Sequence, residues 1–314
     1  MLLKRLGVVL FLIVAVGASV FAGDRVGVLL LAHGHEETWN RQVTELARQL
    51  PYPAVEVAFG MAHRNTIAAA VERLNRQGVA RIVAVPLFVS SHSPIFDATA
   101  YLLGLHAEAP PELELFNRMS HGLQSPAGHV GHGGRSATPL DLSPIPSSSP
   151  VLMTGALDDH PLVAEILASR ATSISRNPGQ EVVILVAHGP TTEKSNRQWL
   201  EKLAQLAHQV ARTGGYRDVH SVTLMDDAPA ALRDKMTARL RRLVADAGTS
   251  GTALVVPVLL SRGGIEPKIR QRLEGLPYRM PETFLLPDAR IGSWICLQVE
   301  DSLKKSERID GGIR

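Results

Sequence analysis

The strongest constraint on the fold is a stretch of sequence that the chain contains twice. VGVLLLAHGHEETWNRQ at residues 26–42 and VVILVAHGPTTEKSNRQ at residues 182–198 both run from apolar residues into Ala-His-Gly and later reach Asn-Arg-Gln. A second pair of matching segments follows in the same order, because Val-Pro-Leu at 85–87 corresponds to Val-Pro-Val at 256–258. This order predicts an internal duplication, in which one structural unit occurs twice.

Apolar runs of strand length alternate with amphipathic segments of helix length in both halves of the chain. Continuous apolar runs such as 26–32 are typical of strands covered on both faces, as in a parallel sheet. The expected strands are 26–32, 55–59, 81–89, 181–187, 219–224, 253–260 and 283–286, with a further strand and helix inside 151–170. The expected helices are 40–49, 94–105, 196–212, 229–247, 266–276 and 289–304, and one that Asn65 or Thr66 caps and Gly78 ends.

This alternation predicts an α/β fold of two duplicated units, each a mainly parallel sheet flanked by helices. The N-terminal unit is expected at 23–175 and the C-terminal unit at 176–314. Residues 117–150 are dominated by glycine, proline and serine, so they are expected to form a flexible insertion in the first unit. That insertion carries His121, His129 and His132.

The N-terminal residues 1–22 resemble a secretory signal peptide. Lys4 and Arg5 precede an apolar stretch, and small residues lead to a cleavage site before Gly23. We therefore expect an exported protein, in the periplasm, with an uncleaved N-terminal anchor as the alternative. No later segment is long and apolar enough to span a bilayer, so no stable membrane span is expected after signal cleavage.

Composition and missing motifs exclude several classes of function. Cys296 is the single cysteine, so an internal disulfide and a thiolate metal cluster are impossible, and histidine and carboxylate must hold any metal. The sequence has neither a GxxxxGK[ST] nor a GxGxxG motif, which argues against a nucleotide cofactor. Aromatic residues make up only 4%, and the net charge of +3 is scattered, so nucleic-acid binding is not expected.

His33 and His92 are the principal candidates for chemistry. Each follows an apolar run that reads as a strand, and ligands of open α/β sheets bind beyond the carboxyl ends of strands. If the two strands are neighbours, both imidazoles face one crevice, where they can bind a metal ion or act as acid and base. The second unit retains His188 but has Gly263 opposite His92, so we expect the histidine pair in the first unit and the other cleft wall in the second.

Three further residues near these loops are considered as candidate site residues, and each has a simpler interpretation. Arg262, in the loop that matches His92, is a candidate for binding a carboxylate-bearing substrate, and the alternative is an ordinary surface arginine. His63 is a candidate third metal ligand or base, and the alternative is a surface position before a helix. His35 is expected to be a bystander, because its counterpart in the second unit is Pro190.

Three short motifs resemble those of a known family. Ala-His-Gly at 32–34, VPLFVSSH at 85–92 and GALDDHPLVAEILASR at 155–170 are similar to motifs of the class II chelatases, in particular the sirohydrochlorin cobaltochelatases in their long, two-unit form. The resemblance implies a tetrapyrrole cleft between the units and ATP-independent insertion of Co²⁺, with Fe²⁺ or Ni²⁺ as alternatives. It also implies that His33 and His92 bind the metal and accept the protons of the pyrrole nitrogens.

Two other functions are compatible with the sequence. One is a periplasmic protein of the same fold that binds tetrapyrrole or metal without catalysis. The other is a metallochaperone or metal buffer that uses the histidines of the 117–150 insertion. Because the duplication lets one chain form a complete cleft, the sequence is also compatible with a monomer.

Overall fold

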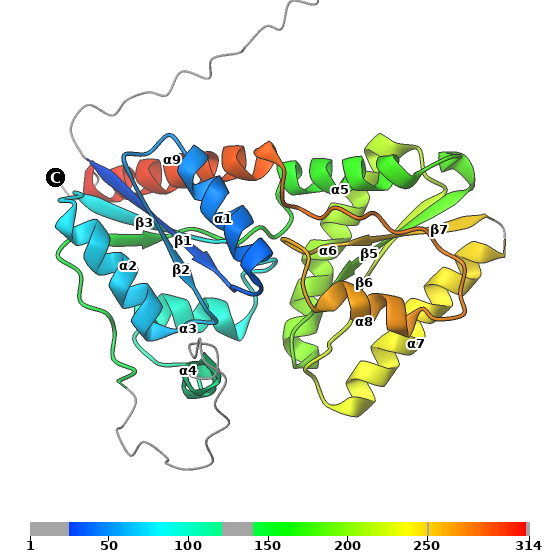
Figure 1. The fold of residues 1–314 in the computed structure, drawn as a ribbon, viewed down its shortest axis with the longest axis horizontal. Coiled ribbons are helices and arrows are strands. Elements are labelled where there is room, and N and C mark those ends of the chain that lie inside the picture. Colours follow the sequence, from blue (N-terminus) through cyan, green and yellow to red (C-terminus); the bar gives the residue numbers. More distant parts are fainter. Residues whose placement is uncertain (1–24, 121–140, 250, 312–314) are drawn as a thin grey trace, which may run out of the picture.

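The computed structural model describes residues 25–120, 141–249 and 251–311 (Figure 1). The N-terminal residues of the expected signal peptide, and His121, His129 and His132, lie outside the described residues. Within the described ranges, no helix has both the length and the apolar character needed to cross a membrane.

Two parallel sheets form the centre of the protein. The first has the order β2-β1-β3-β4, with β1 at Val26–Ala32, β2 at Ala54–Phe59, β3 at Arg81–Pro86 and β4 at Val151–Met153. The second has the order β6-β5-β7, with β5 at Glu181–Ala187, β6 at Asp218–Thr223 and β7 at Thr252–Pro257. The repeated strand that ends in Ala-His-Gly is central in both sheets and nearly fully buried. The predicted α/β duplication is therefore confirmed.

Helices connect the strands and cover both faces of the sheets. In the first half they are α1 (Glu37–Gln49), α2 (Arg64–Arg76), α3 (Pro94–Leu102), α4 (Leu113–Ser120) and α5 (Pro161–Ile174). A short 3₁₀ helix at Pro178–Gln180 precedes β5. The second half has α6 (Glu193–Gly214), α7 (Ala230–Gly248), α8 (Ile265–Arg272) and α9 (Ala289–Gly311).

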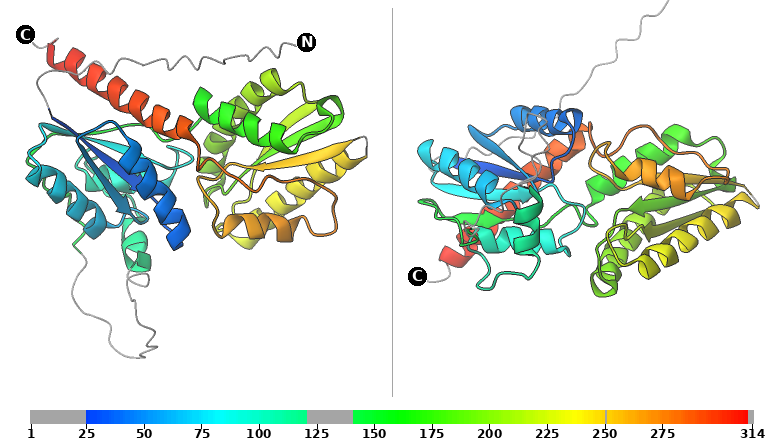
Figure 2. Two further views of the ribbon diagram at one scale, coloured as in Figure 1. Left: turned by 45° about the horizontal axis from the view of Figure 1, so that its top comes forward. Right: turned by 60° about the horizontal axis from the view of Figure 1, so that its bottom comes forward.

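The two halves of the chain exchange a helix. Helix α5 belongs to the first half of the sequence, but it packs on helix α6 and on strand β7 of the second sheet. The C-terminal helix α9 packs instead on strand β3 of the first sheet (Figures 1 and 2). Trp294 of α9 is fully buried in a core that includes residues of both sheets. Arg170 of α5 pairs with Asp288, just before α9, at 3.1 Å. The boundary near residue 175 stays a prediction, and neither sheet is covered only by helices from its own half of the chain.

The expected strand at 283–286 does not form as a strand. The amides of Leu285 and Leu286 donate to the carbonyls of Leu259 and Leu260, and only an isolated parallel bridge joins Leu254 to Arg279. Prolines at positions 281 and 287 bracket the segment, and proline has no amide hydrogen for a ladder, so the pairing stays irregular.

The flexible insertion expected at 117–150 is more ordered at both ends than the sequence suggested. Buried Asn117 of α4 donates to the carbonyl of Ala62 at 3.1 Å. On the far side, the Ile145 amide donates to the Leu102 carbonyl at 2.7 Å, and Arg64 pairs with Asp141 at 2.9 Å. Glycine, proline and serine content did not reveal these anchors, because they depend on single side chains that contact distant elements.

Candidate functional site

A glycine redirects the chain immediately after each repeated histidine. Gly34 has φ +75° and Gly189 has φ +83°, a left-handed conformation that glycine adopts without steric cost. A Cβ atom on Gly189 would lie 2.7 Å from the Cβ of Thr223, so a side chain does not fit there. The tight turn ends the buried strand and leaves His33 and His188 at the carboxyl edge of their sheets, where α/β proteins bind ligands.

His33 and His92 follow neighbouring strands, as the sequence analysis required. β1 and β3 pair in parallel with Leu31 beside Pro86, so their carboxyl ends meet at one edge of the first sheet. His33 is exposed, and its Nδ1 lies 2.9 Å from the Gly34 carbonyl oxygen, which fixes one ring nitrogen and leaves Nε2 for a ligand. His92 is half-buried. Its amide donates to the Ser90 hydroxyl at 3.1 Å.

An aspartate holds the loop that carries His92. The Asp158 carboxylate accepts the Ser91 amide at 2.9 Å and the Ser91 hydroxyl at 2.6 Å. Asp158 has φ +43°, an uncommon conformation for a residue with a side chain. This residue lies in the GALDDHP stretch, and sequence reasoning missed its role. The two adjacent aspartates that follow an apolar run were the available signal.

His33 faces charged groups of the second unit. Desolvation is the largest influence on His33 and lowers its pKa below that of an ordinary histidine, although part of the ring is open to solvent. Its contact with the Gly34 carbonyl opposes this shift, and positive charge on His188 and His35 adds to it. Asp227 acts in the opposite direction. His33 of the first unit and the His188–Asp227 pair of the second are therefore close enough to influence one another, and the space between these strand ends is the place of the expected cleft.

His188 and two aspartates form a compact donor group in the second unit. The Nε2 atom of His188 lies 3.2 Å from Oδ2 of Asp227. One possible ligand atom each from His188, Asp226 and Asp227 lie within 4.8 Å of one another. The hydrogen bond from His188 lowers the pKa of Asp227 below its usual range, and desolvation opposes this shift. Imidazole and carboxylate together suit divalent transition metals.

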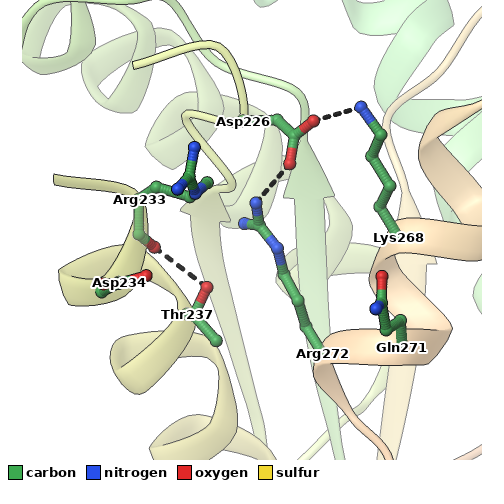
Figure 3. A pocket seen from close by; sticks show the side chains of 7 residues that line it. All are labelled: Asp226, Arg233, Asp234, Thr237, Lys268, Gln271 and Arg272. Atoms are coloured by element: carbon green, nitrogen blue, oxygen red, sulfur yellow. Dashed lines mark hydrogen bonds and ion pairs between the residues drawn. The ribbon is translucent and has the colours of Figure 1, made fainter. Parts of the chain in front are cut away.

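Sequence reasoning also missed the two aspartates, although they follow closely after the carboxyl end of β6. Asp226 is engaged by two cations, since both Lys268 and Arg272 form ion pairs with its carboxylate (Figure 3). These cations line a pocket of about 370 Å³. An adjacent pair of acids after a strand was the signal in the sequence that could have identified this position.

His35, which is expected to be a bystander, lies against the second unit. A Cβ atom added to Gly263 would lie 3.8 Å from the His35 ring, and one added to Gly264 would lie 3.8 Å from its Nε2 atom. Gly263 is the counterpart of His92. Where the second unit lacks its own histidine, the ring of His35 from the first unit occupies the adjoining space.

Direct contacts fix the two units across this cleft. Nε1 of Trp199, on α6, donates to the His92 carbonyl at 2.8 Å. In the reverse sense, Ser261 hydrogen-bonds Gln42 of α1. The helix after each central strand thus reaches the loop after the third strand of the other unit. These paired contacts hold the histidine-bearing loops in a defined relation.

The other two predicted site residues have different surroundings. His63 is 3% exposed at the start of α2, so a metal ion in the cleft would reach it only after a local rearrangement. Arg262 is exposed and pairs with Glu282 at 2.7 Å and Glu266 at 3.9 Å. Its charge is thus matched by two carboxylates, and a substrate carboxylate would have to compete with them.

Comparisons with known proteins give a family match over part of the chain and a shared fold. The model of the CbiX family matches residues 27–93, a segment that contains both His33 and His92. No curated protein matches this chain.

Three solved structures share the fold at low sequence identity. SirB from Bacillus subtilis with Fe³⁺ has 14% identity and a TM-score of 0.59, over 90% of this chain and 97% of that one. The sirohydrochlorin chelatase SirB from Bacillus subtilis subspecies spizizenii, in complex with cobalt, has 14% identity and a TM-score of 0.56 over the same shares. A multi-domain protein from Deinococcus radiodurans with structural similarity to chelatases has 16% identity and a TM-score of 0.50, over 87% of this chain and 54% of that one.

Proposed function

We propose that this protein is an exported chelatase that inserts a divalent metal ion into sirohydrochlorin or a related tetrapyrrole without ATP. The observation that carries this proposal is the CbiX-family match at 27–93, because it spans the two strand ends that bear His33 and His92. The fold shared with SirB, whose solved structures hold Fe³⁺ or cobalt, supports it. Export rests on the sequence of residues 1–22 alone.

The chemistry requires groups that accept protons and bind a metal ion. Insertion of M²⁺ into a free-base tetrapyrrole releases two protons from the pyrrole nitrogens, and four metal–nitrogen bonds form. A histidine with a lowered pKa is neutral near pH 7, so His33 offers a lone pair for a metal ion or for a proton. His92 provides the second imidazole at the same edge of the sheet. No nucleotide is needed, because bond formation to the metal drives the reaction.

In this proposal the metal is Co²⁺, with Fe²⁺ and Ni²⁺ as alternatives. Imidazole and carboxylate ligands bind all three ions, with affinities that follow the general order of the divalent series, so metal supply contributes to the choice. The metal is a substrate in this reaction. The second substrate is a tetrapyrrole with several carboxylates, and Arg262 would contact one of them after release from Glu282.

A spectroscopic metallation assay tests this function directly. Purified protein with sirohydrochlorin and Co²⁺, Fe²⁺ or Ni²⁺ should convert the free-base absorption spectrum to the metallated one faster than the uncatalysed reaction. His33→Ala and His92→Ala should each remove most of this gain, about 100-fold for the loss of an acid–base group. His220→Ala is a matched control, because His220 pairs with Asp218 on the surface of the second unit at 3.2 Å. Rates unchanged in both cleft variants would refute the assignment.

The alternative is a non-catalytic protein that binds tetrapyrrole or metal in the same cleft. One observation favours it: after β2 the first unit offers Ala62 and buried His63, where the second unit offers Asp226 and Asp227. Such a protein would bind the tetrapyrrole with a measurable Kd and leave the metallation rate at the uncatalysed value. Binding titration together with the rate assay separates the two functions.

A further inference from the structure

The pocket between α7 and α8 has an excess of positive charge. Its lining includes Arg233, Lys268 and Arg272, against the carboxylates of Asp226 and Asp234. Figure 3 shows the head groups of Lys268 and Arg272 meeting at Asp226. With a volume of about 370 Å³, the pocket has room for an oxyanion beside these cations.

Asp226 is the residue that this pocket shares with the cleft. One of its carboxylate oxygens pairs with Lys268 and the other with Arg272, so the ion pairs occupy both. Its side chain is only 12% exposed, which makes loss of these partners costly unless another cation replaces them. A metal ion held by His188 and Asp227 would be such a cation, because one possible ligand atom from each of these residues and one from Asp226 lie within 4.8 Å of one another.

The basic groups of the pocket favour an anion between them. Arg272 is anchored by a hydrogen bond from its guanidinium to the Leu224 carbonyl at 2.9 Å, so it would stay in place if Asp226 moved away. Arg233 contributes a second guanidinium group to the same pocket. A carboxylate between the two guanidinium groups would form charge-assisted hydrogen bonds with them.

We propose that the pocket binds a carboxylate of the substrate, and that this anion replaces Asp226 as the partner of Lys268 and Arg272. Asp226 then joins His188 and Asp227 as a third ligand to a divalent metal ion. The inference rests on the proposed function for the identity of the substrate. The exchange itself concerns only an oxyanion, a metal ion and these side chains. It makes metal affinity depend on the polycarboxylate, so that the metal is held most tightly when its acceptor is present.

The proposal is tested by measuring whether a bound anion changes the affinity of the protein for Co²⁺. The Co²⁺ affinity of the full-length protein is measured by titration at constant ionic strength, in chloride, in sulfate, and with copper-loaded uroporphyrin. Sulfate represents a free inorganic oxyanion, and the copper-loaded porphyrin presents carboxylates without free pyrrole N–H groups. We expect the copper-loaded porphyrin to tighten Co²⁺ binding about fivefold or more, the usual range for coupled sites, whether or not sulfate does so too. Identical Co²⁺ affinity under all three conditions would overturn the proposal.

Two variants test whether the anion-dependent gain in Co²⁺ affinity depends on the residues of this pocket. Asp226→Asn should abolish the anion-dependent gain, because the third metal ligand is lost and nothing is exchanged. Should that variant fail to fold, Arg233→Gln keeps the Asp226 ion pairs and should still reduce the gain. A full gain in either folded variant would contradict the exchange. The control His220→Ala should leave the gain unchanged, since His220 pairs with Asp218 at the start of β6, whereas Asp226 follows the end of that strand.

The remaining outcomes distinguish the source of the anion and the role of other histidines. A gain with the porphyrin supports a substrate carboxylate, whereas a gain with sulfate alone overturns the link to the substrate. The titrations are repeated with His121→Ala, His129→Ala and His132→Ala combined, and the gain should persist. If the coupling is present but no metallation occurs, the chelatase function fails and the exchange stands.

Discussion

The two units place different chemistry on the same arrangement of strands. In the N-terminal unit, His33 and His92 follow β1 and β3. In the C-terminal unit, the matching central strand is followed by His188, and β6 is followed by Asp226 and Asp227. One unit therefore offers two imidazoles, and the other offers a mixed nitrogen and oxygen donor set.

This difference suggests that the two copies of the unit have different roles in the reaction. Neutral imidazoles suit proton acceptance near pH 7, and a histidine with carboxylates suits the holding of a divalent metal. The contact from Trp199 to the His92 carbonyl and that from Ser261 to Gln42 keep the two walls in register. We infer that the cleft combines functions that a single copy of the unit does not contain.

The largest effect should come from breaking the helix exchange. Trp294→Ala removes a fully buried side chain of α9 that covers the first sheet, and should lower the free energy of unfolding by about 3–5 kcal/mol. Leu297→Ala, on the same helix but 44% exposed, should change it by about 0.5 kcal/mol or less. Thermal or denaturant unfolding measures both. Equal effects of the two substitutions would show that α9 does not support the core.

An intermediate effect is expected at the His92 loop. Asp158→Asn keeps the size of the side chain, and asparagine tolerates the φ of +43°, but the charge that holds the Ser91 amide and hydroxyl is lost. We expect the metallation rate constant to fall about tenfold because His92 is misplaced, with a loss of stability of about 1–3 kcal/mol. Rate and unfolding measurements on one preparation check this. A wild-type metallation rate in the destabilised variant would show that Asp158 does not position His92.

The smallest effect concerns the pKa of His33. Asp227 raises this pKa across the cleft, so Asp227→Asn should lower it further below that of an ordinary histidine. The protonated form would then appear only at a lower pH. The pH dependence of kcat/KM, which should rise with pH as His33 loses its proton, should shift in the same direction. Titration of the His33 ring by NMR measures the change, and a pKa that moves upward would contradict the cross-cleft contact.

The duplication, the parallel sheets and the strand-end position of His33 and His92 could be predicted from the sequence. Hydrophobic patterns and short repeats report which segments are buried and where strands end. The helix exchange could not be predicted in this way, because the apolar residues of α5 and α9 do not specify which of the two sheets each helix covers. Which sheet each helix covers is decided by the residues that it contacts in the folded protein, and the pattern along the chain does not reveal them.

The candidate site was predictable only in part for the same reason. Comparison of the repeats predicted that Gly263 replaces His92 and that His35 is a bystander, but it could not predict that the His35 ring lies against that glycine. His63 and Arg262 were chosen because their residue types suit ligand binding. Burial of the first and the glutamate partners of the second become visible only when distant segments are brought together.

The different roles of the two units can be tested by one pair of kinetic measurements. Initial rates of metallation are recorded against Co²⁺ concentration for His33→Ala and His188→Ala. We predict that His33→Ala lowers kcat at every Co²⁺ concentration. His188→Ala should raise the KM for Co²⁺ and approach the wild-type kcat at saturation. The same change in kcat and KM for both variants would contradict the account, because the two strand ends would then perform one and the same task.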